Sequence, residues 1–208
     1  MAPATLDFWF EFSSTYSYPA TMRIGALAAQ AGVAVRLRPF LLGPIFQAQG
    51  WNTSPFNLYP AKGRNMVRDL ERLCGDLGLP FRMPEPFPQN SLLHARVAHV
   101  GLGEGWGEDF SRAVYRAEFA EGRPIGETRV VEELLRKLGR DPEKTMAHAA
   151  SDAVKAKLRG ETEEAQRLGV FGAPTFVCSD GELFWGNDRL ERALAWANGR
   201  RLRWAAQT

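Results

Sequence analysis

Residues 6–19 read LDFWFEFSSTYSYP, and this stretch decides the fold. Aromatic side chains stand at every second position, 8, 10 and 12, which is the period of a β-strand. A run of hydroxyl residues follows, and then a helical stretch that ends at Gly32. Residues 33–40 (VAVRLRPF) alternate again and indicate a second strand. Strand, helix and strand in this order predict a parallel βαβ unit whose first turn carries hydroxyls.

The middle of the chain has the pattern of helices without a clear strand. Apolar residues recur at helical spacing over residues 66–77, 106–117, 130–138 and 154–168. Segments rich in Gly and Pro separate these stripes. No dinucleotide-binding fingerprint is present, and residues 101–105 (GLGEG) are expected to form a loop.

Strand signals return near the end of the chain. Residues 173–178 (APTFVC) are short and β-rich, Ser-Asp-Gly at 179–181 is a turn, and residues 182–185 complete an antiparallel hairpin. A last helix is expected from Asn187 onward. Asp188 and Glu191 have the spacing of a capping box at its start.

The predicted order is therefore βαβ, a helical block, and then ββα. The two flanks form one four-stranded mixed sheet with helices on its faces, an α/β pattern of the thioredoxin-like kind with a large all-helical insertion. We expect residues 1–42 and 168–208 to form the thioredoxin-like domain and residues 43–167 to form the helical insertion domain.

Composition excludes several classes of protein. The net charge of +2 is too small to indicate a nucleic-acid partner, and Arg200, Arg201 and Arg203 are interpreted as a solvated tail. No signal peptide and no apolar run of about 18 residues is visible, so we expect a cytoplasmic protein without a membrane span. The three histidines, His94, His99 and His148, show no metal-ligand spacing, and no metal site is expected.

Only two cysteines occur, Cys74 and Cys178, and they form no CxxC pair. A long-range disulfide between them is conceivable, but separate reduced thiols are the default in a cytosolic protein. Neither a zinc knuckle nor a dithiol redox site is encoded by this pair.

Ser14 follows the first predicted strand, where α/β sheets bind ligands near helix N-termini. Ser14 and Ser17 stand at the spacing of a CxxC pair with both sulfurs replaced, so dithiol exchange is excluded there. A hydroxyl can instead donate to a sulfur anion brought by a ligand, with roughly 1.5–3 kcal/mol. That energy would lower the pKa of the bound thiol by about 1–2 units. The alternative is that Ser13 or Ser14 merely caps the helix.

Three further features each allow a structural and a functional interpretation. Pro174 at the start of a strand is either an edge-strand proline or a cis proline that exposes the backbone of Ala173 to an extended peptide. Asp188 either caps a helix or pairs with a ligand ammonium group. Lys62 is either solvated or a cation for a ligand carboxylate.

Four segments together resemble the kappa-class glutathione transferases and the related 2-hydroxychromene-2-carboxylate isomerases, a family related to the disulfide oxidoreductases. They are residues 12–18 (FSSTYSY), 38–43 (RPFLLG), 60–63 (PAKG) and the run from 171–175 (FGAPT) to 185–190 (WGNDRL). They occur in the family's order and span nearly the whole chain.

The resemblance implies a glutathione site. Ser14 matches the catalytic serine that hydrogen-bonds the glutathione sulfur, and Ala173 matches the residue before a cis proline, here Pro174, whose backbone pairs with the cysteinyl part. Asn187 and Asp188 match the pair that holds the γ-glutamyl end. Lys62 matches a lysine near the glycyl end.

The chain also departs from the family pattern. The family asparagine upstream of the lysine has Asn52 or Thr53 as its nearest counterpart. Thr15 stands where the family usually has proline, which changes the helix entry and keeps the hydroxyl. Asn187 favours the isomerase branch over the transferases.

The resemblance therefore implies a glutathione-dependent isomerase. It would interconvert 2-hydroxychromene-2-carboxylate and trans-o-hydroxybenzylidenepyruvate, or a related aromatic acid, by reversible thiolate addition. Its partners would be a small aromatic substrate and glutathione, in a protein that is commonly a homodimer in this family. Phe46, Trp51 and Phe56 are candidates for the walls of the aromatic pocket. Two alternatives stay open: a kappa-class transferase that conjugates or reduces electrophiles, and a non-catalytic thioredoxin-fold module that binds peptides.

Overall fold

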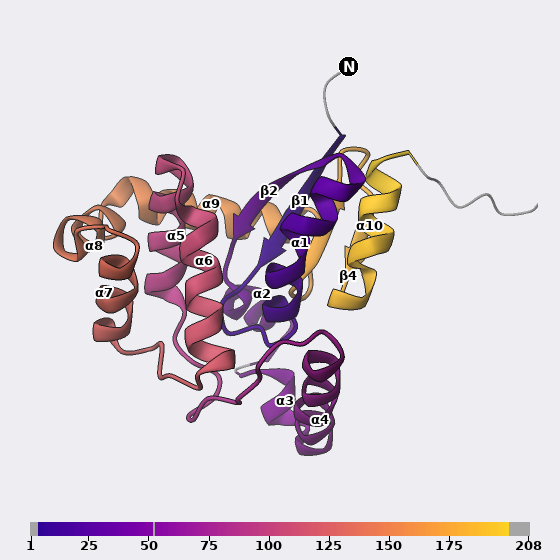
Figure 1. Ribbon diagram of the computed structural model, residues 1–208, viewed down its shortest axis with the longest axis horizontal. Helices are drawn as coiled ribbons and strands as arrows, with labels where there is room; N and C mark the ends of the chain where they lie inside the picture. The colour runs from indigo at the N-terminus through magenta and orange to yellow at the C-terminus, as the bar shows by residue number, and fades with distance from the viewer. Residues whose placement is uncertain (1–3, 52, 200–208) are drawn as a thin grey trace, which may run out of the picture.

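The computed structural model describes residues 4–51 and 53–199 and contains one four-stranded sheet with helices around it (Figure 1). The strands are β1 (Ala4–Phe10), β2 (Val33–Pro39), β3 (Thr175–Cys178) and β4 (Leu183–Trp185). The helices before the central block are α1 (Ser17–Ala31), α2 (Leu42–Ala48), α3 (Pro55–Leu58) and α4 (Pro60–Asp76). Those that follow are α5 (Leu92–Glu104), α6 (Gly107–Tyr115), the π-helical η1 (Arg116–Ala120), α7 (Thr128–Lys137), α8 (Pro142–Ala149), α9 (Asp152–Arg167), the 3₁₀ turn η2 (Asn187–Arg189) and α10 (Leu190–Ala197).

The sheet has the mixed topology that the sequence predicts. β1 pairs with β2 in parallel, from Ala4 opposite Val33 to Phe10 opposite Pro39. β3 runs antiparallel to β1, and β4 antiparallel to β3, in the order β2-β1-β3-β4. The parallel βαβ unit, the C-terminal hairpin and the thioredoxin-like α/β class are thus confirmed.

Both faces of the sheet are covered, which explains the sequence of β1. Phe8 and Phe10 point to the face covered by α1 and α10, where Ile24 and Leu190 lie in the same core. Trp9 points to the opposite face, where Ala165 of α9 and Ile45 of α2 pack around it. A strand buried on both faces reads as a run of large apolar residues. For this reason the strand has an apolar residue, Trp9, where a half-exposed strand would have a polar one.

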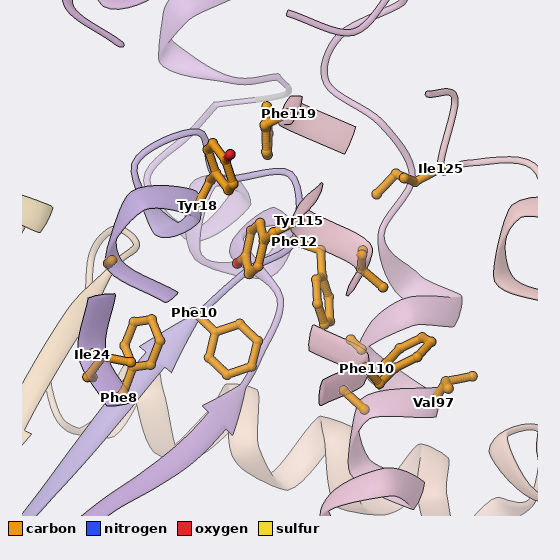
Figure 2. Packing of buried hydrophobic residues seen from close by; sticks show 14 of the residues in the cluster. Phe8, Phe10, Phe12, Tyr18, Ile24, Val97, Phe110, Tyr115, Phe119 and Ile125 are labelled. Carbon is orange, nitrogen blue, oxygen red and sulfur yellow. The ribbon is translucent and has the colours of Figure 1, made fainter. Parts of the chain in front are cut away.

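An aromatic chain joins the sheet to the helical block (Figure 2). Ring centroids lie 5.1 Å apart for Phe8 and Phe10, 5.5 Å for Phe10 and Phe12, and 5.3 Å for Phe12 and Tyr115. Tyr115 then stacks on Phe119. The contacts bring α6 and η1 against the loop that leaves β1, so the helical block shares its core with the sheet.

The loop expected over residues 101–105 is wrong. Most of these residues form the last turn of α5, and Gly105 ends the helix with a positive φ of 84°. The sequence shows no single apolar stripe there because α5 packs against α6, α8, α9 and β2, so its buried residues lie on more than one side of the helix. Its glycines serve packing: a Cβ on Gly101 would lie 2.6 Å from the Trp106 ring, so α5 and α6 approach closely there.

Every segment predicted as helical from its apolar stripe forms a helix, and α2, α3, α5 and α8 are added. The described chain has no strand between β2 and β3. The division into 1–42 with 168–208 and an insertion over 43–167 stays a prediction. Among the described residues, none of the helices is long and apolar enough to cross a membrane.

Candidate active site

Ser14 lies in the turn between β1 and α1, and its hydroxyl points to a residue from the far end of the chain. Its Oγ donates a 2.8 Å hydrogen bond to the carbonyl oxygen of Ala173. Its backbone N–H donates to the carbonyl oxygen of Glu11 at 2.9 Å, which holds the turn in place. The side chain is buried except for a small exposed fraction of 8%.

The capping interpretation of the serines is wrong. Helix α1 begins at Ser17, and its N-cap residue Tyr16 makes no side-chain capping bond. Ser13 donates its hydroxyl to the carbonyl oxygen of Gln89 instead. The hydroxyl of Ser14 is therefore engaged with Ala173 rather than with the helix.

The Ala173–Pro174 peptide bond is cis, as the sequence suggests. The carbonyl oxygen of Pro174 accepts a 2.9 Å bond from the N–H of Gly186, so the loop before β3 meets the loop after β4 there. Among the described residues the Ala173 N–H has no acceptor. An extended ligand could therefore accept a hydrogen bond from it.

Asn187 and Asp188 follow directly after Gly186. Asn187 is buried, and its Oδ1 accepts a 3.2 Å bond from Nη1 of Arg23 on α1. Asp188 is exposed and forms an ion pair with its neighbour Arg189. The expected capping box is wrong: α10 begins only at Leu190, and its N-cap makes no side-chain bond. A carboxylate at Asp188 is thus left facing solvent.

Helix α4 is tied to the serine turn by two side-chain contacts. The Tyr16 hydroxyl donates to Oδ2 of Asp69 at 2.8 Å, and Thr15 Oγ1 donates to the sulfur of Met66 at 3.3 Å. Burial and this bond to Asp69 raise the pKa of Tyr16, and the charge of Asp188 acts in the same direction. Asp188 therefore lies within electrostatic reach of the serine turn.

Lys62 is on the same helix but does not touch Ser14. It lies four residues before Met66, about 6 Å along the helix axis and on the same side. Its Nζ lies 4.7 Å from the centroid of the Tyr59 ring. The Ser14–Ala173 and Pro174–Gly186 bonds thus bring Ser14, Ala173 and Pro174 next to the loop that carries Asn187 and Asp188. Lys62 lies on the helix that Tyr16 and Thr15 contact.

The predicted aromatic walls lie in and around α2. The rings of Phe46 and Trp51 are 5.7 Å apart, while Phe56 belongs to α3. A second aromatic pair, Phe171 and Trp185, stands exposed beside the cis proline, with centroids 5.0 Å apart. Asn52 lies outside the described residues.

A buried polar cluster behind the serine turn was not anticipated from the sequence. The Glu11 carboxylate accepts the hydroxyl of Ser91, and the Glu11 carbonyl oxygen accepts the hydroxyl of Tyr115 at 2.8 Å. Burial raises the pKa of Glu11 to about 7. Glu118 in η1 is fully buried, and neither carboxylate oxygen has a hydrogen-bond partner among residues 4–51 and 53–199. Burial raises its pKa well above the usual range. The sequence signal that could have identified Glu11 is its charge within the aromatic run of residues 8–12.

Neither cysteine of the chain is placed to act as a thiolate. Cys74 and Cys178 are separate, buried thiols, and burial raises the pKa of each to about 11. Among the described residues no group of three or more His, Cys, Asp or Glu side chains could hold a metal ion. The site therefore offers hydrogen-bond donors and charges, and neither cysteine of the chain belongs to it.

This fold and this site define a class of protein: a thioredoxin-like domain with a helical insertion and a hydroxyl in place of the redox cysteine. The model of the DsbA-like thioredoxin domain family matches residues 5–195, so the chain belongs to that family. Within it, the relatives are the 2-hydroxychromene-2-carboxylate isomerases and the kappa-class glutathione transferases, and the chain belongs to this group.

Three comparisons illustrate the relationship. The chain is 30% identical over 193 residues to a 2-hydroxychromene-2-carboxylate isomerase of Sphingobium xenophagum, covering 90% of this chain and 94% of the relative. It is 28% identical over 202 residues to glutathione S-transferase kappa 2 of Caenorhabditis elegans, covering 89% and 88%. A solved structure of a 2-hydroxychromene-2-carboxylate isomerase superposes with a TM-score of 0.83 at 29% identity, covering 94% of this chain and 95% of the other.

Proposed function

We propose that this protein is a glutathione-dependent isomerase that interconverts 2-hydroxychromene-2-carboxylate and trans-o-hydroxybenzylidenepyruvate, or a related aromatic acid. The observation that carries the proposal is the hydroxyl of Ser14 beside Ala173, at the place where thiol oxidoreductases carry a cysteine. Since the chain's own thiols are buried, the sulfur at this place belongs to a ligand.

The residues present fit a glutathione molecule. The Ala173 N–H, which has no acceptor among the described residues, suits the backbone of its cysteinyl part, and the Ser14 hydroxyl bonds to the carbonyl of the same residue. Asn187 and Asp188 suit the γ-glutamyl end, which carries a carboxylate and an ammonium group. The exposed cation of Lys62 suits the glycyl carboxylate.

In the proposed site Ser14 acts as a hydrogen-bond donor. Its hydroxyl would turn from the Ala173 carbonyl to the ligand sulfur, and a charge-assisted bond of this kind contributes about 1.5–3 kcal/mol. The positive end of α1, which begins three residues later, favours the same anion. When bound, glutathione would supply a thiolate that adds reversibly to the conjugated aromatic acid and is not consumed.

The aromatic substrate would lie between the serine turn and the helical block. Phe46 and Trp51 of the α2 region, with Phe56 of α3, are the proposed apolar walls. Tyr16 and Thr15 anchor α4, the helix that carries Lys62, the proposed cation for the glycyl carboxylate.

A kappa-class transferase is the second candidate, because a kappa-class relative is nearly as similar as the isomerase. Asn187 favours the isomerase. The two functions share the site and differ in the fate of the thiol: an isomerase returns it, while a transferase consumes it.

The test is an absorbance assay of the chromene acid with the purified protein and glutathione, with free thiol titrated before and after. Product formation at constant thiol supports the isomerase, and an equal loss of thiol supports the transferase. Absence of glutathione binding by calorimetry at millimolar ligand would contradict both and leave the peptide-binding module.

Two properties of the whole protein complete the proposal. A cytoplasmic location is consistent with two separate thiols, since disulfides are rare in that compartment. A homodimer is proposed from the family resemblance, and sedimentation equilibrium would test it.

A further inference from the structure

Arg23 connects α1 to the loop that carries Asn187 and Asp188. Its Nη1 donates a 3.2 Å bond to Oδ1 of Asn187, and its Nη2 forms an ion pair with Glu191 of α10. Only 19% of its side chain is exposed, so the guanidinium is held between α1, η2 and α10. Nothing in the sequence motifs singles out this arginine.

The chemistry of a guanidinium fixes the orientation of the asparagine. Arginine has only donors, so the Asn187 atom that faces it is the carbonyl oxygen. The amide nitrogen Nδ2 therefore points away from Arg23. Among the described residues Nδ2 has no acceptor, and it is not one of the fully buried polar atoms that lack a partner. It is thus a donor that is open to a ligand.

The neighbouring residue offers the opposite polarity. Asp188 presents an exposed carboxylate whose present partner is the adjacent Arg189. Its Oδ1 lies close to Gly186: a Cβ on that glycine would stand only 2.6 Å from it. The carboxylate therefore lies against the backbone of the loop at Gly186. An amide donor next to a carboxylate acceptor matches the α-carboxylate and α-ammonium of a free amino-acid head.

We propose that Arg23 is a positioning residue that orients the Asn187 amide and thereby selects ligands with a free α-amino-acid head. This inference rests on the proposed glutathione site. Without the guanidinium the amide is free to turn over, and its oxygen would then face the ligand carboxylate and repel it. The selection therefore depends on a residue that does not itself touch the ligand.

The experiment compares two ligands by calorimetry: glutathione, and the analogue in which γ-aminobutyrate replaces the γ-glutamyl residue and the α-carboxylate is missing. Wild type should bind glutathione about tenfold or more tightly than the analogue, the order expected for a charge-assisted bond. Arg23→Met should lose most of this preference, mainly by weaker binding of glutathione. Its KM for glutathione should rise about tenfold, while kcat at saturating glutathione changes less than about twofold.

Matched variants separate positioning from stability. Arg36→Met removes an arginine of β2 whose ion pair with Asp7 is remote from the loop, and it should keep the full preference. Arg23→Lys keeps a donor and should restore part of it. If Arg23→Met does not fold, Asn187→Asp serves instead, because it keeps the bond to Arg23 but removes the donor, and it should lose the same preference.

The outcomes are distinct. No glutathione binding by wild type would overturn the proposed function together with this inference. Glutathione binding by wild type with an unchanged ligand preference in the Arg23 variants would overturn the inference alone. Equal weakening of both ligands would show that Arg23 supports only the fold, and would likewise overturn it.

Discussion

The hydroxyl of Ser14 donates a 2.8 Å hydrogen bond to the carbonyl oxygen of Ala173, although the two residues are 159 positions apart. The bond joins the turn after β1 to the loop before β3. It engages the carbonyl of a residue whose backbone N–H makes no hydrogen bond within the described part of the chain, at a point where the chain has no thiol of its own.

Replacing Ser14 by alanine removes the proposed donor to the ligand sulfur. We expect kcat/KM to fall by about 10- to 100-fold, which corresponds to about 1.5–3 kcal/mol for a charge-assisted bond. The pKa of bound glutathione, followed by the ultraviolet absorbance of its thiolate, should rise by about 1–2 units. Ser13→Ala is the matched control, because that hydroxyl bonds to Gln89, and it should keep its activity. Full activity in Ser14→Ala would contradict the assigned role.

The buried Glu11 should make stability depend on pH. Its pKa is 4.5 in the unfolded chain and about 7 in the folded protein. Within this range the folded protein holds a proton that the unfolded chain has lost, so stability falls as pH rises from 4.5 to 7. The loss reaches about 3 kcal/mol at and above pH 7. Glu11→Gln stays neutral, so its unfolding free energy should gain that amount relative to wild type over the same range, as measured by urea denaturation.

The comparison with wild type is needed because His94 acts in the opposite direction. Burial lowers the pKa of His94 from 6.5 to about 3, so its contribution to stability is lost as pH falls below 6.5. The raised pKa of Glu118 acts in the same direction as that of Glu11. Only the difference between the variant and wild type therefore isolates Glu11. Glu71→Gln, which changes an exposed ion pair with Arg68, should show no such trend. A pH-independent difference for Glu11→Gln would show that Glu11 is ionised in the folded protein.

Tyr16→Phe should loosen helix α4. The lost hydrogen bond to Asp69 is partly buried and is worth about 1 kcal/mol. Hydrogen exchange of the α4 amides should quicken, and the KM for glutathione should rise about fivefold because Lys62 is held less firmly. Asp69→Asn keeps an acceptor and should have a smaller effect. Unchanged exchange in α4 would mean that the Thr15 contact with Met66 suffices to hold the helix.

Gly186→Ala should impair both stability and binding. Gly186 has a φ of 109°, and a Cβ there would lie 2.6 Å from Oδ1 of Asp188. The backbone conformation alone costs about 1–3 kcal/mol for a residue with a side chain. Gly181→Ala is the matched control, since Gly181 has a φ of 87° but open space around it. Both variants should unfold more easily, but only Gly186→Ala should weaken glutathione binding; equal binding by the two would remove Asp188 from the site.

The sequence was informative where a local pattern reports the surroundings of a residue. The period of two in residues 6–12 identified β1, and the turn at residues 179–181 identified the hairpin. It failed at α5, because a helix that packs against several other elements does not bury one regular apolar stripe. It failed again at the start of α10, because Asp188 bonds to Arg189 instead of capping the helix.

Some residues of the candidate site could likewise be selected from the sequence, and others could not. Ser14, Ala173 and Asn187 could be selected from short motifs, and the structure brings them together. Arg23 and the bond between Tyr16 and Asp69 could not be selected, because an arginine or a tyrosine on a helix is ordinary until its partner is known.

By itself the sequence determined the order of strands and helices and the two hydroxyl residues, Ser14 and Ser17, at the spacing of a CxxC pair. Those features follow from local periodicity and from residue identity. Only the tertiary structure decided which oxygen the Ser14 hydroxyl meets, which way the Asn187 amide faces, and that Glu11 is buried with a raised pKa. Each of these depends on residues 80 to 164 positions away, and a hydrogen bond or a desolvated charge exists only once folding has closed that distance.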